Sequence, residues 1–130
     1  MNEFAVLLQG FFAHLINQRD ASRHTITAYR DTIRLFLGYA SAQTGKTPSN
    51  LVLPDLDADQ VTGFLTWLET DRHNSVRTRN TRLAGLKSFY HYASYRAVEH
   101  ADVIRRVLAI PPKREQKAIV EYLTLAEAGP

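Results

Sequence analysis

The sequence predicts an all-α protein of four to five helices. Apolar residues recur at steps of three and four in several separate segments, which is the period of helices with one buried face. Residues suited to helix caps stand immediately before these segments. The alternating apolar pattern of a sheet and the glycine-rich loops of nucleotide-binding folds are both missing.

Length and composition favour one soluble domain. The chain has 130 residues, of which 45% are hydrophobic, and this is enough to bury a core. It contains no cysteine, which excludes disulfides, thiolate zinc sites and cysteine nucleophiles. No apolar run approaches the roughly 20 residues that span a bilayer, and the N-terminus lacks a signal-peptide pattern. We therefore expect a cytoplasmic protein without a membrane partner.

The first helix is expected over residues 2–18, with Asn2 as its N-cap. Its broad apolar stripe consists of Phe4, Leu7, Leu8, Phe11, Phe12, Leu15 and Ile16. Gly10 lowers the helix propensity of this segment and is suited to a close helix crossing.

The second helix is expected over residues 23–42, after the cap Ser22 and before Gly45, which readily takes a left-handed conformation. Its apolar stripe consists of Ile26, Tyr29, Ile33, Phe36, Leu37 and Ala40. An irregular loop over residues 46–57 follows.

The third helix is expected from residue 58 to about 71. Asp57, with Gln60 three residues later, forms a capping-box signature at its start. Its core stripe consists of Val61, Phe64, Leu65 and Leu68. Trp67 lies close to this stripe, so we expect it to pack between helices and not to stack on a ligand.

The segment from Ser75 to Arg96 combines a packing face with a polar face of one charge sign. Asn74 or Ser75 is the expected cap, and the apolar stripe consists of Val76, Leu83, Leu86, Tyr90 and Ala93. The basic residues are Arg77, Arg79, Arg82, Lys87 and Arg96, and no acidic residue interrupts them. Residues 51–71, in contrast, contain acidic residues and no lysine or arginine. A helix of one charge sign favours an anionic partner, and a solvated basic face is the alternative.

A short fifth helix is expected over residues 99–108. Val103, Val107 and Leu108 would face inward, and Arg105 and Arg106 would be exposed. Pro111 and Pro112 then end helical structure.

The remaining residues are expected to form a linker. Residues 113–117 read as a charged, extended connector, residues 118–122 as a short strand and residues 125–128 as the start of another helix. We therefore expect a helical domain over residues 1–110, and a linker with the start of a further domain over residues 111–130.

The sequence contains no group of residues typical of catalysis or metal binding. The histidines are not spaced as metal ligands: His14, His24, His73, His91 and His100. The acidic residues of the third helix are explained by the positive end of a helix dipole. No Gly-x-Ser-x-Gly motif, Walker loop or paired-carboxylate motif occurs. We expect no catalytic residue, metal, cofactor or small-molecule substrate in this chain.

Residues 77–82 are rich in side chains that contact phosphates and base edges. Arg77 and Thr81 lie one helical turn apart, as do Thr78 and Arg82, so that these side chains can meet one groove of a duplex. Asn80 lies nearer to the apolar stripe, and we expect it to bond within the protein instead.

Two segments resemble the N-terminal core-binding domain of tyrosine recombinases, the phage integrase family. Residues 19–40 (RDASRHTITAYRDTIRLFLGYA) are similar to its second helix, in which Thr25, Tyr29 and Phe36 fall on the family pattern. Residues 75–93 (SVRTRNTRLAGLKSFYHYA) are similar to its fourth helix, with a Leu83–Leu86 step and an aromatic pair. The acidic third helix, which lies between these two segments, also matches the order of elements in the family. Residues 113–128 resemble the linker and the opening of the catalytic domain.

The resemblance implies a SAM-like orthogonal helical bundle that clamps duplex DNA through its second and fourth helices for integration or recombination. Carried over by position, the DNA-binding residues are Thr25, Thr27, Arg30, Arg34, Ser75, Arg77, Thr78, Arg79, Arg82, Lys87, Lys113 and Arg114. The implied partners are double-stranded DNA and other recombinase protomers in a synaptic complex. The protein would then be associated with the nucleoid when bound.

The catalytic Arg, Lys, His and Tyr residues of the family belong to a C-terminal domain that this sequence does not show. None of its tyrosines stands in the context of the family nucleophile. We therefore expect that this chain alone is not an enzyme, and that its full-length parent is a tyrosine recombinase. Gly129 and Pro130 do not continue the family pattern.

Two other functions stay open from the residues alone. A helical protein-interaction module would use the acidic third helix and the basic fourth helix as docking surfaces. A helix-turn-helix regulator would need a short recognition helix after a tight turn, whereas the fourth helix is long and follows a longer break.

Overall fold

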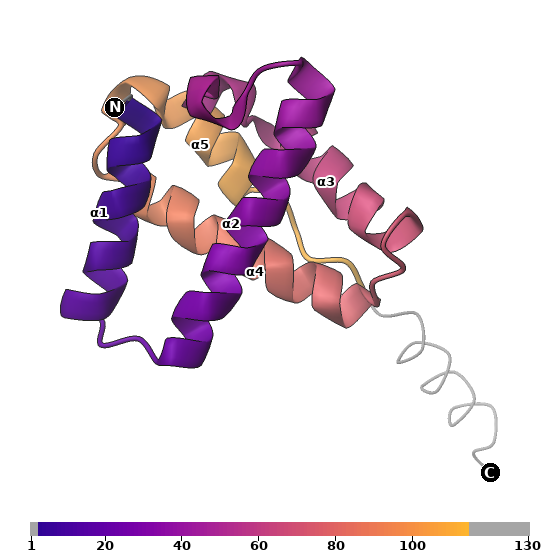
Figure 1. Cartoon of the computed structure of the whole chain (residues 1–130), viewed down its shortest axis with the longest axis horizontal. Coiled ribbons are helices and arrows are strands. Elements are labelled where there is room, and N and C mark those ends of the chain that lie inside the picture. The colour runs from indigo at the N-terminus through magenta and orange to yellow at the C-terminus, as the bar shows by residue number, and fades with distance from the viewer. Residues whose placement is uncertain (1–2, 115–130) are drawn as a thin grey trace, which may run out of the picture.

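The computed structural model describes residues 3–114, which form five α-helices and three single 3-10 turns (Figure 1). The α-helices are α1 (Glu3–Asn17), α2 (Arg23–Thr44), α3 (Ala58–Thr70), α4 (Val76–Ser94) and α5 (Ala101–Leu108). The 3-10 turns are η1 (Pro48–Asn50), η2 (Leu53–Asp55) and η3 (Val98–His100). No strand occurs within the described residues, and the prediction of an all-α fold is confirmed.

Helix α4 is the central element of the bundle. Helices α1 and α2 run in opposite directions, and α4 crosses both of them (Figure 1). Helix α4 contacts each of the other four α-helices. Its predicted stripe is buried from Leu83 to Ala93. Phe89 and Tyr92 are also buried, because α1 packs against a second side of α4 through Phe11.

The helix starts follow from local hydrogen bonds. A side-chain oxygen of Ser22, Asp57 and Ser75 accepts the backbone N–H three residues later, at 3.1, 3.0 and 3.1 Å respectively. Gly45 ends α2 in the left-handed conformation, with a φ of 75°. These predicted caps are therefore confirmed. The predicted cap Asn2 lies outside the described residues.

Two of the predicted buried faces are corrected at helix ends. Ile16 is 53% exposed, because the buried face of α1 runs through Phe11 and Leu15 and leaves the next residue on the outside. In α5 the buried residues are Ile104 and Val107, whereas Val103 is only half-buried. Leu108, also predicted to face inward, is half-buried as well.

Two of the helical glycines lie against a tyrosine side chain of another helix. A Cβ atom at Gly10 would meet the hydroxyl at the far end of the Tyr92 side chain, so Gly10 leaves room for this side chain, and the close helix crossing stays a prediction. A Cβ atom at Gly85 would lie 3.2 Å from Cδ1 of Tyr29, which marks the crossing of α4 over α2. Trp67, as predicted, packs between helices, with its ring 5.7 Å from that of Tyr39.

The predicted strand over residues 118–122 and the helix start over residues 125–128 lie outside the described residues. Within residues 3–114, no helix has the length and apolarity needed to cross a membrane.

Candidate nucleic-acid interface

The crossing of α2 and α4 brings several predicted site residues to one surface. The Arg82 guanidinium donates a hydrogen bond from Nη1 to Oγ1 of Thr32 on α2, at 2.9 Å. Thr25 lies two turns before Thr32 on the same face of α2. Thr78 lies one turn before Arg82 on α4. Thr25 and Thr78 therefore lie on the two helix faces that Arg82 connects.

Both helices begin with the same arrangement of hydroxyl groups. The Ser22 hydroxyl donates to Oγ1 of Thr25 at 2.9 Å, and the Ser75 hydroxyl donates to Oγ1 of Thr78 at 3.1 Å. Each serine also caps its helix, and both hydroxyl pairs are exposed. The positive end of a helix dipole favours anions at such positions. We call Thr25, Ser75, Thr78 and Arg82, with the exposed Arg77 on the first turn of α4, the α2–α4 surface; Thr32 is buried beneath it and holds Arg82.

Two other cations that are predicted to contact DNA are paired with an acidic residue. The Arg79 side chain is only 12% exposed, and its Nε lies 3.4 Å from Oε1 of Glu69 on α3. The Lys113 ammonium donates to Oε2 of the same carboxylate at 2.8 Å. Glu69 therefore compensates both charges. Sequence reasoning missed this residue because its partners lie far along the chain.

Asn80 holds the backbone of Lys113. Its Nδ2 donates to the Lys113 carbonyl at 2.7 Å, and its Oδ1 accepts the Lys113 N–H at 2.8 Å. The prediction that Asn80 bonds within the protein is thereby confirmed. The side-chain amide pairs with the backbone as a neighbouring strand would, so Lys113 is held beside the start of α4 (Figure 1).

The other predicted contacts lie away from the α2–α4 surface. The Arg30 guanidinium lies 5.5 Å from the ring centroid of Phe12 on α1, which places it on the α1 side of α2. Thr27 and Arg34 share this side by helical spacing and are exposed. On α4, Lys87 is half-buried. Arg114 is exposed and directly follows the residue that Asn80 holds.

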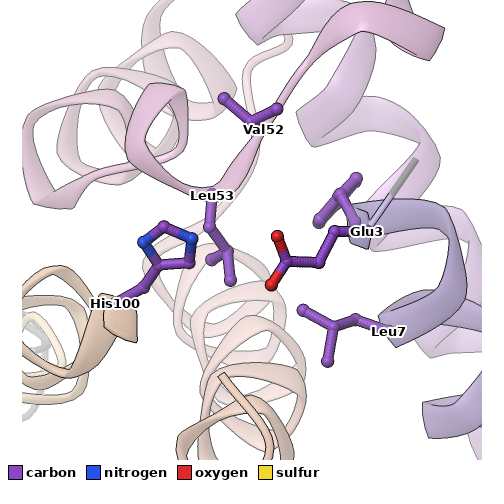
Figure 2. Close-up of a pocket in the computed structure, with 6 residues that line it drawn as sticks. Glu3, Leu7, Val52, Leu53 and His100 are labelled. Carbon is purple, nitrogen blue, oxygen red and sulfur yellow. The ribbon is translucent and has the colours of Figure 1, made fainter. Parts of the chain in front are cut away.

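A polar cluster that the sequence did not predict lies at the start of α1. The Glu3 carboxylate points into a small pocket lined by Leu53 and His100 (Figure 2). Ligand atoms of Glu3, Glu99 and His100 lie within 4.8 Å of one another. The Glu99 carboxylate accepts a hydrogen bond from the protonated form of Glu3, and this bond, together with the negative charge of Glu99, raises the pKa of Glu3. Glu3 and Glu99 are both exposed, and exposed acidic groups commonly lie together without a metal, so we assign no metal to this cluster.

Comparison with known proteins points to one family. The profile of the family described as phage integrase, N-terminal SAM-like domain, matches residues 8–97. The chain is 45% identical over 124 residues to a proposed integrase/recombinase, y4rC, of Sinorhizobium fredii, covering 95% of this chain and 37% of the relative. It is 40% identical over 124 residues to y4rD of the same organism, covering 95% and 44%.

More distant similarity extends to tyrosine recombinases named for their activity. The tyrosine recombinase XerD of Listeria monocytogenes is 31% identical over 86 residues, covering 66% of this chain and 27% of the relative. The chain thus spans less than half the length of these curated relatives. No solved structure gives a significant match.

Proposed function

Because the chain belongs to the family of phage integrase N-terminal SAM-like domains, we propose that it is the DNA-binding part of a tyrosine recombinase. Residues 1–110 form the domain that grips the duplex, and residues 111–130 lead to a catalytic domain. The whole protein cleaves and rejoins DNA strands in integration or recombination, and it acts together with other protomers on one DNA site.

The observation that carries this proposal is the α2–α4 surface. It joins two helix N-termini, two exposed hydroxyl pairs and the cations Arg77 and Arg82. Hydroxyls, guanidinium groups and helix N-termini are the groups that most often contact DNA phosphates. The bond from Arg82 to Thr32 holds the guanidinium in place before DNA arrives, which lowers the entropic cost of binding.

Not all of the predicted contacts have the same role in this proposal. Arg79 and Lys113 hold the linker through Glu69, and a phosphate would have to displace that carboxylate to reach them. Five other residues contact the margins of the bound duplex: Thr27, Arg30, Arg34, Lys87 and Arg114. The four cations among them add charge to the interface, and all five residues contribute less affinity than Arg77 and Arg82.

A salt titration of duplex binding tests the proposal. We expect the logarithm of the binding constant to fall linearly with the logarithm of the salt concentration, with a slope of about −0.9 for each phosphate neutralised. Arg77→Ala/Arg82→Ala should make this slope shallower. Arg105→Ala/Arg106→Ala is the matched control, because it removes the same charge from exposed positions on α5 that are paired with Asp102.

The outcomes distinguish duplex binding through the α2–α4 surface from a general effect of net charge. The proposal predicts a large loss of affinity for the α4 variant and a small one for the α5 variant, with both proteins folded by circular dichroism. Equal losses in the two variants would show that only net charge matters. Wild-type binding that ignores salt, or no binding at low salt, contradicts the proposal.

A further inference from the structure

A groove lies between the C-terminal ends of α1 and α4, away from the residues of the α2–α4 surface. It has a volume of about 390 Å³. The polar side chains that line it belong to His14, Arg19, Ser88, His91, Tyr95 and Arg96. None of the described residues that line the groove is acidic. It therefore offers several hydrogen-bond donors, and two guanidinium groups, to an anion.

The groove continues the exposed face of α4. Five residues follow one another at helical spacing along that face: Arg77, Thr81, Ser88, His91 and Tyr95. At 1.5 Å per residue, the distance from Arg77 to Tyr95 is about 27 Å. Apart from the exposed Ala84, the face is polar, and it contains no acidic residue along this length. A ligand that contacts the start of α4 can therefore extend into the groove at its end.

The two arginines of the groove keep their charges uncompensated, unlike Arg79. Within residues 3–114, neither Arg19 nor Arg96 forms an ion pair, and both are exposed. The Arg96 guanidinium lies over the ring of Tyr92, 4.0 Å from its centroid. This stacking orients the planar group at the wall of the groove. Arg19 approaches from the connection between α1 and α2.

We propose that this groove binds a backbone phosphate of the DNA strand opposite to the one that the α2–α4 surface contacts. The inference rests on the proposed function and extends it to both strands. One side of α2 faces Arg82 on α4, and another side faces α1. The protein groove lies at the C-terminal end of α1. A major groove about 12 Å wide admits one helix, so a helix inserted there has a phosphate backbone on each side.

Removal of the two guanidinium groups tests the inference. Arg19→Ala/Arg96→Ala should make the slope of the salt titration shallower by about 0.9 for each phosphate that the protein no longer neutralises. Arg105→Ala/Arg106→Ala again serves as the control of equal charge, and its slope should not change. The single variant Arg19→Ala is measured as well, because the double variant also loses the Arg96–Tyr92 stacking and could unfold. The Arg19 side chain forms no hydrogen bond or ion pair within residues 3–114, so its removal breaks no such contact.

A strand-specific measurement locates the contact. Neutral methylphosphonate groups are placed singly along each strand of the duplex, and binding is measured for the wild type, Arg19→Ala and Arg82→Ala. We expect the substitution that loses its effect in Arg19→Ala to lie on one strand, and the substitution that loses its effect in Arg82→Ala to lie on the other. Location of both on the same strand overturns the inference.

Failure of the inference is distinguishable from failure of the proposed function. If the wild type binds with a steep salt dependence and Arg19→Ala changes nothing, the groove has no role and the proposed function stands. If the wild type does not bind duplex DNA, both are wrong. If inorganic phosphate shifts the NMR signals of His91 but Arg19→Ala leaves DNA affinity intact, the groove is a site for free anions and the inference is overturned.

Discussion

Gly10 in α1 and Gly38 in α2 both lie inside helices but have opposite surroundings. Nothing lies within 4 Å of a Cβ atom placed at Gly38, so Gly38→Ala gains helix propensity without a clash. We expect it to raise the free energy of unfolding by about 0.5–1 kcal/mol. At Gly10 the added methyl group meets the hydroxyl of Tyr92, whose ring is buried beside Phe11. We expect Gly10→Ala to lower the free energy of unfolding.

Urea unfolding of the two variants measures this difference. Each serves as the control for the other, because the change in chemistry and in intrinsic propensity is the same. An equal gain in stability for both would show that the Tyr92 hydroxyl moves away from Gly10 without cost.

The interactions that the sequence predicted in full, partner included, are those with local partners. Ser22, Asp57 and Ser75 bond to a backbone N–H three residues away, so the spacing of the residues contains the whole interaction. The partners of Glu69, in contrast, are set by how α3, α4 and the linker pack together. No spacing in the sequence contains that information, so the pairing of Arg79 with Glu69 was not predictable.

At the scale of elements, the linker depends on one side chain of α4. Replacing Asn80 by alanine removes both hydrogen bonds to the Lys113 backbone. We expect hydrogen exchange at the Lys113 amide, followed by NMR, to lose its protection in Asn80→Ala. The cost in global stability should be only about 1–2 kcal/mol, because the bonds are exposed to water and the ion pair with Glu69 remains.

A nearly isosteric variant provides the control for the linker. Asn80→Asp keeps an oxygen that accepts the Lys113 N–H and loses only the donor to the carbonyl. Protection of the Lys113 amide should therefore survive in this variant. Equal protection in the wild type and in Asn80→Ala would mean that proline stiffness at Pro111 and Pro112, and not Asn80, holds the linker.

The faces of α4 were only partly predictable from the sequence. The rule of one buried stripe finds Leu83, Leu86 and Tyr90, which face the core. Phe89 and Tyr92 lie outside that stripe and are buried because α1 covers a second side of the helix. A central helix such as α4 buries more than one side. Its exposed polar face is therefore narrower than the number of its basic residues suggests.

At the scale of the whole molecule, the folding unit extends beyond the part that the family profile matches. That match ends at residue 97, before α5 begins. Nevertheless Ile104 and Val107 of α5 are only 1% and 0% exposed, and α5 packs on α3 and α4. The core of the domain is therefore incomplete without α5, and the domain boundary near residue 110 stays a prediction.

Truncating one buried side chain of α5 tests this view. Ile104→Ala removes apolar atoms from the core and leaves a cavity, for which we expect a loss of about 2–5 kcal/mol in the free energy of unfolding. Val98→Ala is the control: it also shortens an aliphatic side chain beyond residue 97, but Val98 is 70% exposed, so its cost should stay within about 0.5 kcal/mol. Urea unfolding should show one cooperative transition in both variants. If Ile104→Ala costs no more than Val98→Ala, the domain folds without α5 and its boundary lies near residue 97.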